Sequence, residues 1–165
     1  MHSGISDVNP NLKSASNSFE LTTPEEVAEV ATHFADVLMG REILMFYGNL
    51  GSGKTFFIRH LAKALGIREP VVSPTFTIMH EYHEGRFTFY HFDLYRLSSP
   101  DELWELGLPE ILASDQAVIA FEWAEKFQTE WLPRPPISLF FEHIPTGRRL
   151  TISGLPQDIA QRLQL

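Results

Sequence analysis

The chain has 165 residues, of which 44% are hydrophobic and 21% charged, so we expect one globular domain with its own core. Its net charge of -8 argues against non-specific binding to nucleic acid or to an anionic membrane, because both need a basic surface. The lack of cysteine excludes disulfides, cysteine-based zinc sites and a cysteine nucleophile. No apolar run approaches the roughly 20 residues of a membrane span, and the N-terminus lacks a signal-peptide pattern, so we expect a cytoplasmic protein.

The N-terminal stretch differs in composition from the rest of the chain. Residues 1–18 are rich in serine, asparagine and other turn-formers, and they show no hydrophobic period. We therefore expect a flexible arm over residues 1–18 and a single folded domain over residues 19–165.

The first predicted helix has a clear beginning and end. In Thr23-Pro24-Glu25-Glu26, Thr23 can act as N-cap and Glu26 can complete a capping box. Apolar residues at helical spacing follow as far as Leu38, and Gly40 is expected to end the helix. Such regular spacing indicates a helix that packs against the core.

The central pattern of the chain is a glycine-rich loop between a predicted strand, residues 43–47, and a predicted helix that begins near residue 54 and ends at Gly66. A strand before the loop and a helix after it are the context in which this loop binds phosphate. The loop matches G-x-x-x-x-G-K-[ST] at every fixed position and consists of Gly48, Asn49, Leu50, Gly51, Ser52, Gly53, Lys54 and Thr55.

These residue types suit the binding of a nucleotide triphosphate. Glycines let successive backbone N–H groups curl around phosphate oxygens, and the N-terminus of the following helix attracts the same anion. Lys54 is expected to reach the β- and γ-phosphates, and the hydroxyl of Thr55 is expected to bind Mg²⁺. The sequence therefore predicts a nucleotide-binding protein.

A proline-rich loop over residues 70–78 follows the predicted helix and leads into a strand. In P-loop enzymes a hydroxyl on this loop can approach Mg²⁺ or the γ-phosphate, which makes Thr75 a candidate. The alternative is a plain turn in which Ser73 caps locally.

Two strands, residues 76–82 and 87–93, are predicted to form a hairpin around a turn that contains Gly85. The second strand ends at Asp93, and α/β proteins keep their chemistry at the carboxyl ends of strands. Three histidines lie nearby, namely His80, His83 and His91. We do not expect a zinc site, because positions 80 and 83 face opposite sides of a strand and no cysteine completes a ligand set.

A further helix is expected after Ser99-Pro100-Asp101-Glu102, which reads as a second capping box. A fully buried strand over residues 117–122 follows and ends at Glu122, as a Walker B strand does. A carboxylate after this apolar run is costly to bury unless a cation meets it, so Glu122 is expected to organise Mg²⁺ or the attacking water. Trp123 is expected to pack rather than to stack on a base.

A second hairpin, residues 137–144 and 148–153, and a short helix from residue 156 to 163 complete the chain. Together these elements predict an α/β fold, namely a three-layer P-loop NTPase domain whose mixed β-sheet contains antiparallel hairpins.

The order of four motifs resembles the TsaE family, formerly called YjeE. The resemblance covers residues 20–154, and its specific parts are the Ser-Pro-Thr block at 73–75 and the His-Phe-Asp-Leu-Tyr-Arg block at 91–96, beside the phosphate loop and the Phe-Glu-Trp block at 121–123. It implies an ATPase that works with TsaB and TsaD to form threonylcarbamoyladenosine, which stands beside the anticodon of tRNAs that read ANN codons.

The resemblance also implies roles for single residues. Thr55 and Glu122 are assigned to the Mg²⁺ neighbourhood, and Asp93 is assigned as a functional carboxylate. Because Asp93 ends a neighbouring strand, we also expect it to offer Mg²⁺ a second carboxylate through water, so Lys54, Asp93 and Glu122 are the catalytic candidates. Thr23 and Arg148 are assigned to the nucleotide pocket, because the family draws on the start of the first helix and on a Gly-Arg near the last hairpin.

Two other functions stay open, namely a P-loop small-molecule kinase and a non-catalytic module whose nucleotide gates the binding of a partner. A kinase usually adds an arginine-rich lid, and no arginine cluster of that kind occurs here. A GTPase is disfavoured, because the chain has no Asn-Lys-x-Asp tetrapeptide. The scarcity of arginine predicts slow intrinsic turnover, and the net charge of -8 predicts no tight direct binding of tRNA.

Overall fold

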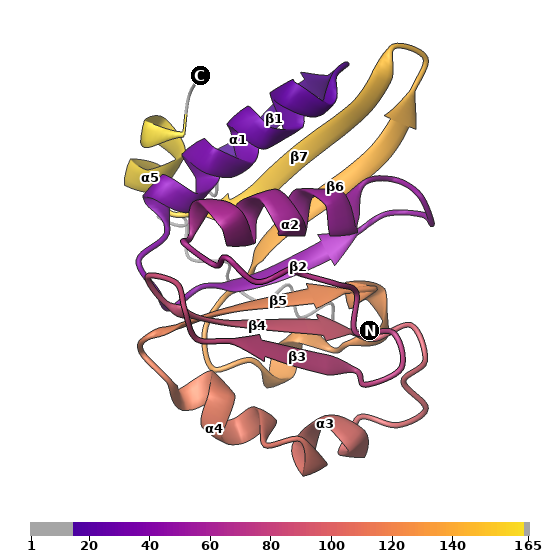
Figure 1. The fold of residues 1–165 in the computed structure, drawn as a ribbon, viewed down its shortest axis with the longest axis vertical. Helices are drawn as coiled ribbons and strands as arrows, with labels where there is room; N and C mark the ends of the chain where they lie inside the picture. Colours follow the sequence, from indigo (N-terminus) through magenta and orange to yellow (C-terminus); the bar gives the residue numbers. More distant parts are fainter. Residues whose placement is uncertain (1–14, 164–165) are drawn as a thin grey trace, which may run out of the picture.

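The computed structural model describes residues 15–163, which form one mixed β-sheet with helices on both faces (Figure 1). The strands are β1 (Ala15–Leu21), β2 (Ile43–Tyr47), β3 (Met79–Tyr82), β4 (Thr88–Asp93), β5 (Ala117–Glu122), β6 (Ile137–Ile144) and β7 (Gly147–Leu155). The helices are α1 (Pro24–Val37), α2 (Lys54–Ala64), α3 (Asp101–Glu105), α4 (Leu108–Ala113) and α5 (Gln157–Arg162), with short 3₁₀ turns at Ala124–Lys126 and Thr129–Trp131.

The seven strands lie in the order β1-β7-β6-β2-β5-β4-β3. The central pairs β6–β2, β2–β5 and β5–β4 are parallel, whereas β1–β7, β7–β6 and β4–β3 are antiparallel. The two hairpins predicted from the sequence supply antiparallel pairs on both sides of the parallel centre. The mixed sheet is thereby confirmed.

Alternate residues of the central strands enter two separate cores, which makes the domain three-layered. Along β2, Leu44 and Phe46 join the core beneath α1 and α2, whereas Ile43 and Met45 join the core beneath α3 and α4. Figure 1 shows α1 and α2 side by side in front of the sheet, with α3 and α4 at its lower end. The predicted three-layer α/β architecture is confirmed, and it places the carboxyl ends of β2, β4 and β5 at one edge.

The boundary of the predicted N-terminal arm is wrong at its end. Residues 15–18 belong to β1, which pairs with β7 from Ala15 opposite Leu155 to Leu21 opposite Arg148. This partner lies more than a hundred residues away in the sequence, so local composition could not reveal it. The rest of the predicted arm, residues 1–14, lies outside the described residues.

The second predicted capping box does not form. Pro100 stands at the N-cap of α3 in helical conformation and makes no side-chain cap hydrogen bond. The side chain of Glu102 accepts from the N–H of Ser98 instead of Ser99, and the hydroxyl of Ser99 accepts from Asp101 instead of Glu102. In each of the two predicted hydrogen bonds, the donor is thus the N–H of the preceding residue. Helix α3 is only five residues long.

The strand predicted from residue 76 begins only at Met79. Residues 75–77 form a turn, and Ile78 has a left-handed backbone with φ of 66°. The carbonyl of Ile78 accepts a hydrogen bond of 2.8 Å from the N–H of Asp93. This bond ties the proline-rich loop to the end of β4, where the candidate carboxylate stands.

Candidate nucleotide-binding site

The phosphate loop leaves the beginning of α2 without a side-chain cap. Gly53 is the N-cap residue, with φ of 109°, a conformation that favours glycine. No acidic residue occupies the first turn of α2. The first backbone N–H groups of the helix therefore remain free to meet an anion.

Close packing around the loop explains the glycine at its beginning. A Cβ on Gly48 would lie 2.6 Å from the carbonyl oxygen of Phe141 and 2.6 Å from the hydroxyl of Ser52. Ser52 itself is 1% exposed, and its hydroxyl has no hydrogen-bond partner within the described residues. A buried hydroxyl in a loop of this shape is suited to a phosphate oxygen.

Lys54 is buried at the start of α2, with its ammonium group turned back toward the loop. It donates to the carbonyl oxygens of Gly48 and Asn49, and its Nζ lies 3.9 Å from the ring centroid of Trp123. Burial lowers the pKa of Lys54, and the carboxylates of Glu122, Glu125 and Asp93 oppose that shift. The site thus holds a desolvated cation among acceptors that a phosphate can replace.

Trp123 packs against the core beneath α3 and α4, as the sequence indicates. The sequence did not predict the contact of this ring with Lys54, because the contact depends on the backbone conformation of Trp123. Trp123 has φ of 56° directly after β5, in the left-handed region that a bulky side chain rarely adopts. This conformation lets the indole ring stand over the lysine while Tyr95 packs on it at 4.9 Å between ring centroids.

Glu122 and Thr55 connect the phosphate loop to the end of β5. The hydroxyl of Thr55 donates to Oε1 of Glu122 at 2.6 Å, and the imidazole of His91 lies 2.7 Å from Oε2. Burial raises the pKa of Glu122, but the hydrogen bonds and charges of its neighbours outweigh burial and leave that pKa below its usual value. Glu122 is therefore a buried carboxylate that stays ionised at neutral pH.

Asp93 stands in register with Glu122 at the end of the neighbouring parallel strand, as predicted. Its Oδ2 accepts from the hydroxyls of Ser73 and Thr75, at 2.9 and 3.3 Å, and its Oδ1 accepts from the N–H of Tyr95 at 2.9 Å. The two hydroxyls thus share one carboxylate, so Ser73 does more than cap a local turn, and the approach of Thr75 to Mg²⁺ or the γ-phosphate stays a prediction. Ser73 was not among the predicted site residues.

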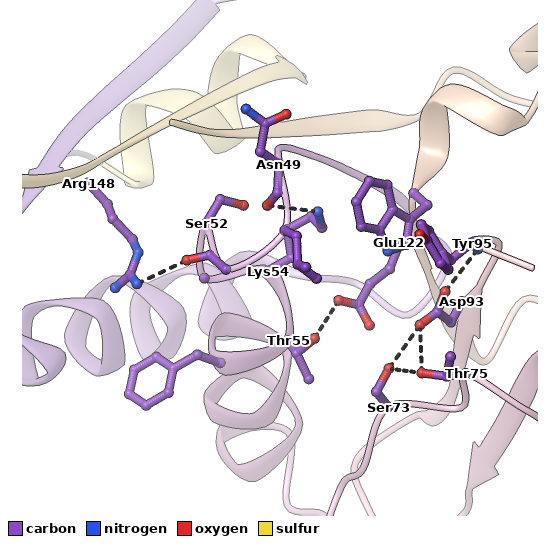
Figure 2. A pocket seen from close by; sticks show the side chains of 15 residues that line it. Asn49, Ser52, Lys54, Thr55, Ser73, Thr75, Asp93, Tyr95, Glu122 and Arg148 are labelled. Atoms are coloured by element: carbon purple, nitrogen blue, oxygen red, sulfur yellow. Dashed lines mark hydrogen bonds between the residues drawn. The ribbon is translucent and has the colours of Figure 1, made fainter. Parts of the chain in front are cut away.

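These groups surround one open cavity of about 460 Å³ at the carboxyl edge of the sheet (Figure 2). Figure 2 shows Thr55 and Glu122 facing each other across its centre, with Asp93, Ser73 and Thr75 on one side and Arg148 on the other. Arg148 donates to the carbonyl of Gly51 at 3.1 Å. The lining consists of Asn49, Leu50, Gly51, Ser52, Gly53, Lys54, Thr55, Phe56, Ser73, Thr75, Asp93, Tyr95, Glu122, Trp123 and Arg148.

Most of the predicted site residues thus meet in one place, and two stand apart. Gly48 does not line the cavity, but its carbonyl oxygen accepts a hydrogen bond from the ammonium group of Lys54. Thr23 is not in the lining of the cavity, and its hydroxyl accepts from the N–H of Glu26 as the N-cap of α1. Its assignment to the nucleotide stays a prediction.

The chemistry of the cavity suits ATP with Mg²⁺. Thr55, Glu122 and Asp93 offer hydroxyl and carboxylate oxygens, which Mg²⁺ prefers, and the free N–H groups of α2 suit the phosphates. Within residues 15–163, no group of three or more histidine, cysteine or acidic side chains is placed to hold a metal ion by itself. Mg²⁺ commonly takes only one or two protein carboxylates and completes its shell with water and phosphate.

The expectation that the histidines form no zinc site stays a prediction. His80 and His91 stand opposite each other on β3 and β4, and the imidazole of His91 is engaged by Glu122. None of the helices among residues 15–163 is long and apolar enough to cross a membrane.

Comparisons with known proteins agree with these features. The family model described as "Threonylcarbamoyl adenosine biosynthesis protein TsaE" matches residues 21–150, a range that contains all the predicted site residues. The chain is 40% identical over 131 residues to the tRNA threonylcarbamoyladenosine biosynthesis protein TsaE of Rickettsia bellii, covering 79% of this chain and 89% of that protein. It is 40% identical over 126 residues to the protein of that name from Bacillus subtilis, covering 76% and 77%. The crystal structure of Bacillus subtilis YdiB superposes with a TM-score of 0.76 at 28% identity, covering 91% of this chain and 95% of the other.

Proposed function

The chain belongs to the TsaE family, whose members act in tRNA threonylcarbamoyladenosine biosynthesis, and from this premise we propose that it is a Mg²⁺-dependent ATPase with slow intrinsic turnover. It assists TsaB and TsaD in forming threonylcarbamoyladenosine beside the anticodon of tRNAs that read ANN codons. The observation that carries the proposal is the hydrogen bond of 2.6 Å from Thr55 to Glu122, which joins a phosphate loop to a strand-end acid in one cavity.

The phosphate loop holds the nucleotide. The N–H groups at the start of α2 and the buried hydroxyl of Ser52 bind phosphate oxygens, and Lys54 supplies the positive charge. For this, the ammonium group exchanges the carbonyls of Gly48 and Asn49 for phosphate. Thr55, Glu122 and Asp93 would hold Mg²⁺, and the ion would supply positive charge to the transferring phosphoryl group.

The two acids divide the remaining work. Glu122 is ionised and fixed at both carboxylate oxygens, so it can orient the attacking water and accept a hydrogen bond from it. Asp93 sits one strand further along and ties the Ser73–Thr75 segment to the cavity. A change at Asp93 therefore affects both a carboxylate and the position of the loop.

Slow turnover follows from the scarcity of positive charge around the phosphates. Arg148 is the one arginine that lines the cavity among residues 15–163, and it is held by the carbonyl of Gly51. An arginine from the TsaB–TsaD pair, or ordering of the Ser73–Thr75 segment on docking, then raises the rate. Hydrolysis is thereby made conditional on assembly.

The test compares ATP turnover by the isolated chain and by the chain with the TsaB–TsaD pair. Slow Mg²⁺-dependent release of phosphate without an acceptor, faster with the pair, is the expected result. A small-molecule kinase requires an acceptor, and a purely nucleotide-gated module binds ATP without turnover. Direct binding of tRNA by the isolated chain at physiological salt is expected to be weak, since the net charge is -8.

Glu122→Ala provides the sharpest single-residue test of this proposal. It is expected to lower turnover by about a hundredfold or more while changing ATP affinity far less, because the ground-state phosphate contacts survive. Turnover and the dissociation constant of ATP are measured on the same preparation. Equal losses in both would remove Glu122 from the hydrolytic step and leave it a role in binding alone.

A further inference from the structure

His91 is a buried histidine that touches the candidate acid without lining the cavity. It is 0% exposed, and its Nε2 lies 2.7 Å from Oε2 of Glu122. The other carboxylate oxygen of Glu122 accepts from Thr55 at 2.6 Å. Since an ionised carboxylate can only accept, Nε2 of His91 carries the proton in this hydrogen bond.

The register of the sheet brings the two side chains together. His91 pairs with Ala120 on β5, and Asp93 pairs with Glu122 two residues later. Residues two apart on a strand share a face, so His91, Asp93, Ala120 and Glu122 all point toward the α2 layer. The methyl group of Ala120 leaves the imidazole free to lean along the sheet and reach Glu122.

The hydrogen bond to Glu122 accounts for the presence of a polar ring at position 91. Phe89 lies on the same face with its ring centroid 6.5 Å from that of His91. Nδ1 of His91 has no hydrogen-bond partner within the described residues. A fully buried polar ring that is satisfied at only one nitrogen is costly, and an apolar residue at this place would avoid that cost.

We propose that His91 is a positioning residue that fixes the carboxylate of Glu122 in the orientation that Thr55 and the attacking water require. Two hydrogen bonds from opposite sides, by Thr55 and His91, leave the carboxylate one orientation in the cavity. Loss of one of them frees it to rotate toward Lys54. This inference rests on the proposed ATPase function and adds a residue that does not itself contact nucleotide.

The first experiment compares three variants by turnover and by direct measurement of ATP affinity. His91→Leu keeps the volume and removes the donor, whereas His91→Gln places an amide N–H where Nε2 stands. We expect His91→Leu to lower kcat by about tenfold to a hundredfold with the dissociation constant of ATP changed by less than about threefold, as for partners that orient a ligand group. His91→Gln is expected to recover most of the lost kcat. His80→Leu, on the paired position of β3, is the control and is expected to leave both constants unchanged.

The outcomes separate positioning from packing. Equal losses in the leucine and glutamine variants, or a loss confined to ATP affinity, would overturn the proposal. If His91→Leu does not fold, the comparison of the glutamine variant with the wild type still decides, because a positioning role requires that the amide support turnover.

A second measurement does not depend on turnover. In the nucleotide-free wild-type protein, ¹⁵N NMR of the imidazole groups is expected to show His91 protonated at Nε2, with a slowly exchanging N–H that shifts in Glu122→Gln. His83, whose side chain is 66% exposed, serves as the internal reference for a solvent-accessible ring. A His91 signal that exchanges like His83 and ignores Glu122→Gln would contradict the proposal. Absence of ATP turnover in the wild type would instead defeat the proposed function and leave this measurement valid.

Discussion

The two long helices that lie side by side on one face of the sheet begin in opposite ways. Helix α1 closes its own N-terminus: the Thr23 hydroxyl accepts from the N–H of Glu26, and the Glu26 carboxylate accepts from the N–H groups of Thr22 and Thr23. Helix α2 has no such cap and begins after Gly53 with a lysine. Both helices pack through a similar apolar face, so packing does not explain the difference.

The difference is the one expected between a structural helix and a helix that binds an anion. The Thr23 hydroxyl takes the N–H of Glu26, Pro24 has no N–H, and the acidic side chains of the first turn complement the helix dipole, so this end is not open to an anion. In α2 the same donors are left free at the mouth of the cavity, next to Lys54 and Thr55. An uncapped helix is tolerated here because an anion can complete it.

The largest expected effect is the loss of Lys54. Lys54→Ala removes the charge at the open end of α2, so we expect ATP affinity or turnover to fall by about a hundredfold or more. Lys54 is buried, but it lines the cavity, so we expect the folded state to persist.

The matched control for this variant is Lys63→Ala. Lys63 lies in the last turn of the same helix, is exposed and does not line the nucleotide cavity. Isothermal titration and circular dichroism on both variants check the expectation. If Lys54→Ala kept full ATP affinity and turnover, the start of α2 would not be the phosphate-binding site.

A second prediction makes the start of α2 resemble that of α1. Gly53→Asp places a capping acceptor and a negative charge at the N-cap, where they compete with phosphate for the free N–H groups. Gly53→Ala brings the strain of the positive φ and a Cβ 3.2 Å from Cδ of Arg148, but no acceptor.

We expect the alanine variant to lose about 1–2 kcal/mol of stability through that strain, and the aspartate variant to bind ATP at least about tenfold more weakly than the alanine variant. Melting curves and ATP titrations of the pair give the two effects separately. Equal ATP affinity in both variants would mean that open N–H groups are not what binds the nucleotide.

The contrast between the two helix starts could be predicted from the sequence, because both are encoded within a few consecutive residues. The order Thr-Pro-Glu-Glu and the order Gly-Ser-Gly-Lys-Thr act locally, and the structure confirms the elements predicted from them. The strand ends Asp93 and Glu122 were predicted for a similar reason, since an acid after an apolar run stands out.

What sequence reasoning missed depends on partners far away in the chain. The sequence suggests His91 only as a metal ligand, because its contact with Glu122 follows from the parallel register that sets it beside Ala120, two residues before Glu122. Pairing the two predicted strands in parallel would have revealed it. The composition of residues 15–18 predicts a flexible arm, because nothing local marks a strand whose partner β7 comes at the end of the chain. The left-handed turn at Trp123 has no local signal at all.

A smaller effect is expected at the closed end of α1. Thr23→Ala removes the side-chain cap, and we expect a loss of about 1 kcal/mol in the free energy of unfolding. Urea denaturation of the variant and the wild type measures it. The family resemblance also assigns Thr23 to the nucleotide pocket, so ATP affinity is measured on the same variant. A fall in affinity without loss of stability would make Thr23 a nucleotide residue rather than a cap.

The smallest expected effect concerns the charge of Glu26. The hydrogen bonds from Thr22 and Thr23 lower the pKa of Glu26 in the folded state. A carboxyl group with a lowered folded pKa adds stability above its unfolded pKa of about 4.3 and loses it as the pH falls through the lower folded value.

Glu26→Gln keeps the shape and the acceptor oxygen but carries no charge. The stability difference between wild type and this variant should therefore be constant near pH 7 and shrink below about pH 4. Helix α2 has no acid in its first turn, so no comparable acid-sensitive difference arises at its open end. Urea denaturation at several pH values tests this, and a difference that persists unchanged into acid would show that the hydrogen bonds of α1, and not the charge on Glu26, close that helix.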